Sequence, residues 1–383
     1  MKAILAWMMA LALLFALPAA AEEAEVTMEP QRFELAENLV SYPKLTGLAD
    51  AALEEAINQQ LVASLGVDDY LARVALLLSS PVKMSADYQA AVHDDVLSVV
   101  MEATGAVVNN RATHVWTAAN IDLTTGNPVA LDDLFSDPAA AREAIADYLD
   151  YTVAPELSAH LSAGALTPIP ETFALAPTGL TLYYPIDQLA TLSDRAGAVS
   201  IHFGEIAEYL DLSEGSVLDR IGAPEHLTLT EGSRAELEAT LSQGVLGDIP
   251  MAIGESVQAL TDAHGLLIDP DLYEGGRMFQ LEGAAYRKVF LLTDALTEAW
   301  DASAVQGIRA DRLNYLGLCT GRTTREEWLA ALGAPETTLT VDETGAEQWR
   351  IVPGTSDYYT FGSYRLRLHA DENGLLSSVF LMQ

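Results

Sequence analysis

The sequence predicts an α+β protein, on three observations. Runs rich in β-branched and aromatic residues follow one another along the chain, which favours antiparallel strands. Other stretches carry apolar residues at four-residue steps and predict helices outside those runs. From residue 248 onward, a pattern of one helix followed by strands occurs twice. Because helices and strands are grouped rather than alternating, we expect mainly antiparallel sheets with flanking helices.

The N-terminus has the three-part pattern of a cleaved secretory signal. Lys2 precedes an apolar run over residues 3–17, and small residues then lead to an abrupt acidic start at Glu22. The apolar run is shorter than the roughly 18 residues of a membrane-spanning helix. We therefore assign residues 1–21 to a signal peptide. The mature protein is expected to be secreted, extracellular and associated with the cell envelope, without a membrane span.

Length and charge limit the possible functions. The chain has 383 residues and a formal net charge of −35, so two or three domains are expected. Such a negative field repels nucleic acid and anionic lipid headgroups and favours cationic partners. The simpler interpretation is that dispersed acidity keeps an exported protein soluble. Cys319 is the only cysteine, which excludes a disulfide within the chain.

We place the first domain at residues 22–210. Its helices and strands are predicted, in order, as extended sequence over 31–45, helices over 48–65 and 68–78, strands within 87–108 and 112–123, a helix from 138 to about 151, a hairpin of strands 172–175 and 180–184, a strand over 198–203 and a helix over 205–210. The first helix carries Leu or Ile at four-residue steps from Leu53 to Leu65, which gives one apolar face. Ser136 or Asp137 can cap the helix that begins with Pro138.

Three segments of this domain resemble a known family. They are YPKLTGLADAALEEAINQQL at 42–61, ATHVWTAANIDLTTGNPVALDDLF at 112–135, and FALAPTGLTLYYP with VSIHFGEIAEYL between 173 and 210. Together they are similar to the extracellular domain of the anti-sigma factor RsiV, which also precedes the catalytic domain of the peptidoglycan deacetylase PdaC. The resemblance implies a non-catalytic extracellular domain that binds lysozyme.

The same resemblance, together with the negative charge, points to a loop as the partner-binding segment. This loop joins two predicted strands and should lie at the surface. Its predicted partner-binding residues are Asp187, Gln188, Thr191, Leu192, Asp194 and Arg195.

The rest of the chain is predicted to form a helical linker over 211–247 and two repeats over 248–315 and 316–383. A short helix between glycines, GESVQALTDAHG at 254–265, matches GRTTREEWLAALG at 321–333. Polar turns at 273–276 and 342–345 and about three strands follow each helix. These strands are expected at 277–281, 286–292 and 305–308 in the first copy, and at 347–352, 358–368 and 375–381 in the second.

The repeats resemble BamE-like envelope proteins and related secreted tandem domains. The second helix ends in Leu332, Gly333, Ala334 and Pro335, which matches that family's motif of a helix followed by a three-stranded meander. Thr323 with Glu326, or Thr324 with Glu327, can form a capping box for this helix. The turn Asp371 to Gly374 predicts a hairpin between the last two strands.

Residues able to carry chemistry are dispersed. The histidines (93, 114, 160, 202, 226, 264 and 369) lack short-range pairing, so structural or surface roles are favoured over a zinc site. The pairs Asp68–Asp69, Asp94–Asp95 and Asp132–Asp133 are interpreted as solvated faces rather than calcium ligands. No nucleophile-elbow serine or nucleotide-binding loop is present in the sequence, which weakens hydrolase and nucleotide-dependent functions. No cofactor is expected.

Two further groups have a structural and a functional interpretation. Tyr358, Tyr359, Phe361 and Tyr364 could stack on sugars, although core packing is the favoured role of an aromatic strand. Cys319 lies in an apolar run and is interpreted as a small buried side chain, with a redox role left open.

The sequence therefore predicts a secreted, non-enzymatic binding or sensing module of the bacterial cell envelope. Its partner is expected to be a cationic protein such as lysozyme, or a cell-wall component. One alternative is a cell-wall enzyme whose site is assembled from dispersed residues such as His114 and the aspartate pairs. A structural envelope adaptor is the other alternative.

The signal-peptide assignment is directly testable. We expect exported protein to begin at Glu22, because Ala19 and Ala21 stand at the positions that a signal peptidase prefers. N-terminal sequencing of protein from the culture fluid checks this. Recovery of a chain that starts at Met1 in a membrane fraction would instead make the segment an anchor.

Overall fold

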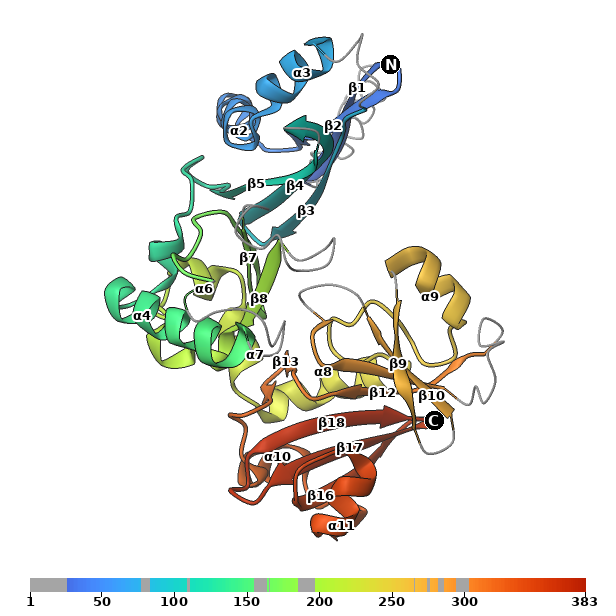
Figure 1. Cartoon of the computed structure of the whole chain (residues 1–383). Coiled ribbons are helices and arrows are strands. Elements are labelled where there is room, and N and C mark those ends of the chain that lie inside the picture. Colours follow the sequence, from blue (N-terminus) through green and yellow to red (C-terminus); the bar gives the residue numbers. More distant parts are fainter. Residues whose placement is uncertain are drawn as a thin grey trace, which may run out of the picture.

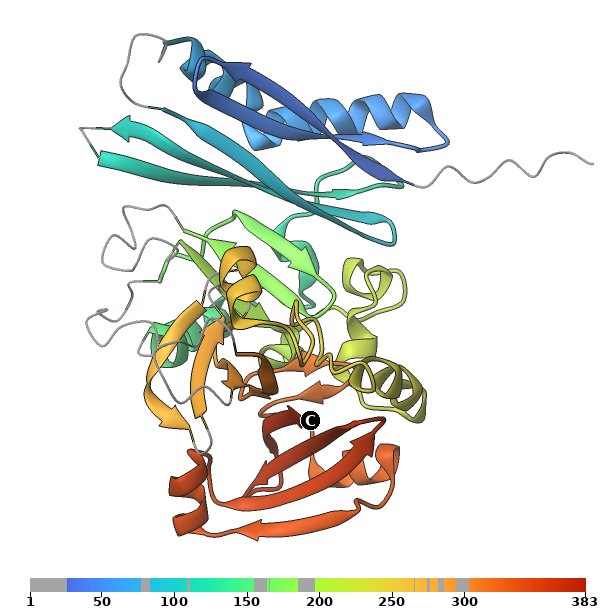
Figure 2. The same cartoon turned by 90° about the vertical axis from the view of Figure 1, so that its right-hand side faces the viewer.

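The chain forms three bodies, each with its own hydrophobic core (Figure 1). The computed structural model describes residues 26–76, 83–108, 111–154, 164, 166–184, 197–264, 266–273, 276–281, 286–293 and 303–383. We name the N-terminal body (26–127), the middle body (128–227) and the C-terminal body (228–383). Figure 2 shows them one above the other. The α+β class with mainly antiparallel sheets is confirmed.

The N-terminal body is a five-stranded sheet covered on one face by two helices. The strands, in spatial order, are β1 (Thr27–Leu35), β2 (Asn38–Thr46), β3 (Ser85–His93), β4 (Val96–Val108) and β5 (Arg111–Asp122). All neighbours are antiparallel except β2 and β3, which are parallel. The helices are α2 (Ala51–Leu65) and α3 (Val67–Leu76).

Helix α2 shows why the four-residue pattern was informative. Ile57, Leu61 and Leu65 are fully buried against the sheet, as the apolar face predicts. Asp50 caps the helix, accepting hydrogen bonds from two backbone amides. Gly66, in the left-handed conformation, ends it and lets α3 begin at the next residue.

The middle body contains the predicted hairpin and third strand. These are β6 (Phe173–Ala176), β7 (Gly179–Tyr183) and β8 (Ala198–His202), and they form one antiparallel sheet. Helix α4 (Pro138–Tyr148) packs beside them and continues into a π-helical turn at Leu149–Val153. Asp137, one of the two predicted caps, accepts a hydrogen bond from the backbone of Ala140. Two short 3₁₀ turns take the place of the helix expected over 205–210.

Two predicted boundaries differ from the structure. The single domain at 22–210 contains two cores, and the middle core extends to Leu227. The predicted linker at 211–247 is helical, with α6 (Val217–Arg220), α7 (Ala223–Leu227) and α8 (Glu231–Leu241). It is not a free spacer, because α6 and α7 pack in the middle core and α8 packs in the C-terminal core.

The C-terminal body is built on one eight-stranded antiparallel sheet. Its strands are β9 (Leu266–Tyr273), β10 (Gly276–Leu281), β11 (Val289–Thr293), β12 (Val305–Ala310), β15 (Thr337–Val341), β16 (Gly354–Phe361), β17 (Tyr364–Asp371) and β18 (Leu376–Met382). The spatial order is β15-β16-β17-β18-β12-β11-β10-β9. The last strands of the two copies, β12 and β18, pair at the centre. The two copies therefore share a sheet rather than forming separate units.

Each copy also differs in detail from the prediction of a helix and three strands. The helices α9 (Val257–His264) and α10 (Arg325–Leu332) are present, and Thr324 with Glu327 forms the capping box of α10. Among the described residues, four strands of the eight-stranded sheet, not three, follow each helix. The strand predicted at 358–368 is a hairpin of β16 and β17, since Gly362 supplies a left-handed turn residue.

The prediction of a strand at 347–352 was wrong. Residues Glu343–Trp349 form helix α11, because Asp342 caps it by accepting a hydrogen bond from Gly345 N. The polar sequence at 342–345 is therefore a helix start rather than a strand-connecting turn. By contrast, the hairpin turn predicted at Asp371 to Gly374 joins β17 and β18 as expected.

Polar side chains hold the N-terminal body on the middle body. Ser98 Oγ donates to Asn120 Oδ1 at 2.7 Å and accepts from Leu175 N at 2.9 Å. The amide nitrogen of Asn120 donates to Phe173 O at 2.8 Å. All of these side-chain groups are buried, so each bond satisfies a group that water cannot reach. The joint between the two bodies is consequently specified by hydrogen bonds as well as by apolar contact.

A small hairpin holds the C-terminal body on the middle body. It consists of β13 (Asn314–Tyr315) and β14 (Leu318–Cys319). The Asn314 amide donates to Thr178 O at 2.8 Å, and Cys319 is fully buried in the middle core. Burial raises the pKa of the Cys319 thiol to about 12, in keeping with the predicted role of a small buried side chain. No helix among the described residues has the length and apolar character needed to cross a bilayer.

The C-terminal core depends on residues that precede the predicted repeats. Leu237, Leu241 and Leu246 are fully buried in it. Burying one such side chain contributes about 1.5–3 kcal/mol, and whole domains are stable by only about 5–15 kcal/mol. We therefore expect a fragment of residues 228–383 to unfold cooperatively on heating and a fragment of 248–383 to lose that transition. Circular dichroism of both fragments checks this, and equal melting temperatures would contradict it.

Candidate functional site

The predicted partner-binding residues fall outside the part of the chain that the structure describes. Asp187, Gln188, Thr191, Leu192, Asp194 and Arg195 belong to this undescribed segment. The residues on either side of it are described. Tyr184 N donates to Gly197 O at 2.6 Å, so the two ends of the segment are tied together.

An aromatic pair lies where the two ends of this segment meet. Trp116 of β5 stacks on Tyr183 of β7, with ring centroids 6.2 Å apart. A Cβ atom at Gly197 would come within 2.1 Å of the Trp116 ring, so glycine is required there. We call Trp116, Tyr183, Tyr184 and Gly197 the loop base. The sequence alone does not single out Trp116, because an aromatic residue within a strand gives no signal that another strand's aromatic residue lies beside it.

The histidine side chains that the structure describes are not gathered into one site. His93, His226 and His369 lie in the N-terminal body, the middle body and the C-terminal body respectively, and burial lowers the pKa of each. The side chain of His114 is outside the described set. Within the described residues, no group of three or more His, Cys, Asp or Glu side chains is arranged to hold a metal ion.

The aspartate pairs also have separate structural roles. Asp68 and Asp69 lie in the first turn of α3, where carboxylates stabilise a helix. Asp95 pairs with Arg220 at 2.9 Å across the joint between the N-terminal and middle bodies. Asp132 pairs with Arg142 at 2.6 Å. These carboxylates serve three different elements and do not form a shared site.

The aromatic strand of the second repeat is mostly core. Tyr358, Tyr359 and Phe361 are each at most 7% exposed, and Tyr359 and Phe361 belong to the C-terminal core. Tyr364 is partly buried beside it. The packing role favoured from the sequence therefore fits these side chains, and they do not form an open surface for sugars.

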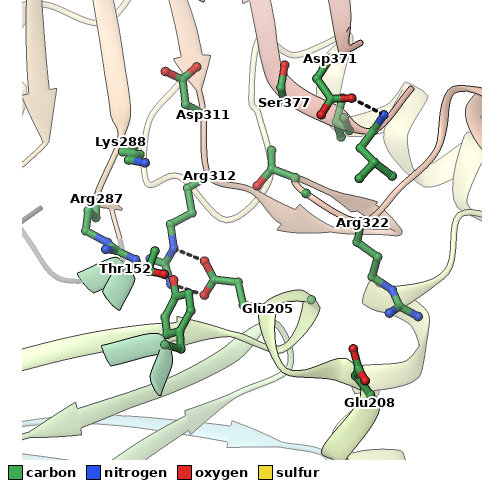
Figure 3. Close-up of a pocket in the computed structure, with 16 residues that line it drawn as sticks. Thr152, Glu205, Glu208, Arg287, Lys288, Asp311, Arg312, Arg322, Asp371 and Ser377 are labelled. Atoms are coloured by element: carbon green, nitrogen blue, oxygen red, sulfur yellow. Dashed lines mark hydrogen bonds and ion pairs between the residues drawn. The ribbon is translucent and has the colours of Figure 1, made fainter. Parts of the chain in front are cut away.

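A pocket of about 490 Å³ lies where the middle and C-terminal bodies meet (Figure 3). The middle body contributes the end of α4 and the segment after β8. The C-terminal body contributes the segments before β11 and after β12 and β14, and the β17–β18 hairpin. Its cationic lining residues are Arg287, Lys288, Arg312 and Arg322. Its acidic lining residues are Glu205, Glu208, Asp311 and Asp371.

A buried ion pair crosses this joint. Arg312 Nε and Nη2 each donate to a Glu205 carboxylate oxygen at 2.8 Å, and Nη2 also donates to Ser200 O at 2.7 Å. The Arg312 side chain is only 4% exposed and that of Glu205 18%. Figure 3 shows the two side chains pointing toward each other from opposite bodies. Burial pushes the pKa of Glu205 upward, but the bonds and charge of Arg312 outweigh it and lower this pKa to about 2.

Two neighbouring side chains, Tyr148 and His202, interact with this ion pair. Tyr148 accepts a hydrogen bond from Arg287 Nη2 at 2.8 Å, and burial together with the charge of Glu205 raises the Tyr148 pKa to about 12. Burial and the positive charge of Arg312 lower the pKa of His202 to about 3. At neutral pH the tyrosine is therefore protonated and the histidine is uncharged, while Arg312 and Glu205 carry opposite charges.

The fold is that of an α+β protein with mainly antiparallel sheets. No protein-family model matches the sequence, and no curated protein matches it. The chain is similar to a solved structure of a DUF3298 family member from Bacteroides fragilis, with 15% identity and a TM-score of 0.38 over 52% of this chain and 98% of that chain.

Two other solved structures are similar over smaller shares of the chain. A DUF3298 family protein from Pseudomonas aeruginosa PAO1 has 13% identity and a TM-score of 0.33, over 49% of this chain and 94% of that chain. A DUF4309 family protein from Bacillus subtilis has 14% identity and a TM-score of 0.25, over 40% and 97%. Such values assign neither a family nor a function. The RsiV-like and BamE-like resemblances therefore stay predictions.

The buried ion pair makes stability depend on Glu205. We expect Glu205→Gln to lower the free energy of unfolding by about 3–5 kcal/mol at pH 7, because Arg312 would be left buried without its counter-charge. The matched control, Glu208→Gln, changes an exposed carboxylate of the same pocket and should stay within about 0.5 kcal/mol of wild type. Urea unfolding monitored by fluorescence gives both values.

The difference in free energy of unfolding between wild type and Glu205→Gln should depend on pH. The folded-state pKa of Glu205, about 2, lies below its ordinary value of 4.5. Its contribution to stability is therefore complete above the ordinary value and is lost as pH falls from there toward the folded value. The gap between wild type and Glu205→Gln should shrink between pH 5 and pH 3. A gap that is constant with pH would contradict this role.

Proposed function

We propose that the protein is an exported, non-enzymatic binding module of the bacterial cell envelope that captures a cationic protein at the loop base. The leader pattern at residues 1–21 supports export. The RsiV-like resemblance supports a non-catalytic receptor role and suggests lysozyme as the first partner to test. Three carboxylates that could have served catalysis, Asp95, Asp132 and Glu205, are each held by an arginine.

The observation that carries this proposal is the aromatic pair of the loop base. Trp116 and Tyr183 are both partly exposed. Tryptophan and tyrosine are enriched among the residues that dominate binding energy at protein interfaces. A rigid aromatic pair beside the predicted partner-binding segment therefore provides an anchor on a fixed scaffold.

The charge of the chain supports the choice of a cationic partner. A net charge of −35 attracts a basic protein over distances of about a Debye length, roughly 8 Å at physiological salt. Such attraction mainly raises the association rate, while the aromatic anchor slows dissociation. Binding should therefore depend on both salt and the loop base.

Calorimetric titration with lysozyme tests the proposal. We expect heat of binding at low salt and a weaker affinity at several hundred millimolar salt, where the Debye length is only a few ångströms. Trp116→Ala should weaken binding on the order of tenfold or more, as loss of an interface anchor does.

The control variant is Phe33→Ala, which changes a 38% exposed aromatic residue on β1. It should bind as wild type does. Absence of heat at both salt concentrations with folded protein would reject the proposal, and so would equal losses in Trp116→Ala and Phe33→Ala.

A further inference from the structure

The pocket between the middle and C-terminal bodies is richer in basic residues than the acidic chain as a whole. The sequence has 55 acidic and 20 basic residues, yet four of those basic residues line this one cavity. They come from three separate segments, at 287–288, 312 and 322, so the fold rather than the sequence brings them together. Basic and acidic residues are therefore equal in number around the cavity, whereas acidic residues far outnumber basic ones in the chain, and such a local enrichment in cations favours anion binding.

Three of the four acidic lining residues are already engaged. Glu205 is held by Arg312, as described above. Asp311 accepts two hydrogen bonds from Arg309, one of them from Nε at 2.7 Å. Asp371 accepts from the backbone amides of Asn373 and Leu375, both at 2.9 Å. Arginines therefore balance the charges of Glu205 and Asp311, and backbone amides fix the position of Asp371. Glu208 is the lining carboxylate that makes no hydrogen bond or ion pair within the described part of the chain.

Two arginines retain donor capacity. Arg312 is nine-tenths buried, and its Nη1 atom has no hydrogen-bond partner among the described residues. A buried donor without a partner costs about 1–3 kcal/mol, and such groups are few in folded proteins. Arg322 is exposed at the opposite side of the pocket, and its guanidinium makes no hydrogen bond or ion pair within the described ranges. The pocket thus offers unused guanidinium donors on two walls.

We propose that this pocket binds a small hydroxylated anion, a sugar acid or sugar phosphate, through its carboxylate or phosphate oxygens. Guanidinium groups recognise both oxyanions. Thr152, Thr320 and Ser377 line the same cavity, and a hydroxyl can both donate to and accept from a sugar hydroxyl. The volume of about 490 Å³ lies within the range of small-molecule sites.

A ligand in this position contacts both bodies. It would meet Arg312 and Arg322 on two walls formed by the C-terminal body, and Thr152 on the wall formed by the middle body. A ligand that binds only the assembled joint stabilises the folded chain by mass action. The site is distinct from the loop base, so it does not depend on the proposed capture of a cationic protein.

The test is titration of the full mature chain with D-glucuronate, glucose 6-phosphate and glucose at matched ionic strength. Calorimetry gives the affinity, and thermal unfolding gives an independent readout. We expect binding of at least one anionic sugar and a higher melting temperature in its presence, with no effect of glucose. Binding of glucuronate alone identifies a carboxylate ligand, binding of glucose 6-phosphate alone identifies a phosphate ligand, and binding of both identifies general oxyanion recognition.

Two variants with opposite expected effects separate recognition from a loss of folding. Arg322→Gln should weaken binding of the anionic sugar on the order of tenfold, the value of one charge-assisted hydrogen bond. Glu208→Gln should strengthen it, because a repelling carboxylate is removed. The matched control, Arg73→Gln, changes an exposed arginine on α3 of the N-terminal body and should leave affinity unchanged.

Three results would overturn the proposal. One is the absence of binding by both anionic sugars with folded protein. Another is equal binding of glucose, which would mean that the anion is not recognised. The third is an Arg322→Gln variant that binds as well as Arg73→Gln.

Discussion

The ion pair between Arg312 and Glu205 is the interaction on which the arrangement of the middle and C-terminal bodies depends. Two charges withdrawn from water stabilise a fold only when good geometry and further hydrogen bonds offset the cost of removing them from water. Both Glu205 oxygens accept from Arg312, and one also accepts from His202 N at 2.8 Å. These bonds permit one relative placement of the two bodies. The pocket lies directly beside the pair and exists only in that placement.

The other joint is built from different chemistry. Ser98 and Asn120 are neutral, and the ion pairs of Arg220 with Asp95 and Asp122 lie near the surface of that joint. Neutral hydrogen bonds contribute about 1 kcal/mol each and carry a smaller desolvation penalty than a buried charge pair. The loop base spans this second joint, since Trp116 belongs to the N-terminal body and Tyr183 to the middle body. A partner held there would bridge those two bodies.

Local physics explains which elements the sequence could predict. Helix α2 was predicted because one buried face requires Leu and Ile at four-residue steps, and the β17–β18 turn because its Asp and Gly residues favour that backbone. Strand β15 was missed because it is an exposed edge strand, so it lacks the alternation that burial imposes. The strand expected at 347–352 failed because capping by Asp342 favoured a helix. No local sequence pattern could predict the pocket, since Arg312 and Glu205 are 107 residues apart in sequence.

The two candidate sites would select ligands of opposite charge. The electrostatic field of the protein that acts on each ligand depends on how far the ligand is from the surface. A net charge of −35 acts on a large basic protein through many carboxylates at once, so that protein is attracted before any contact forms. A small anion is repelled at long range, but salt screens this repulsion beyond roughly 8 Å. Inside the pocket, hydrogen bonds from guanidinium groups act at about 3 Å in a less polar medium, where they are stronger than in water. An acidic protein can therefore hold a cationic partner at its loop base and, at the same time, an anionic ligand in the joint between its middle and C-terminal bodies.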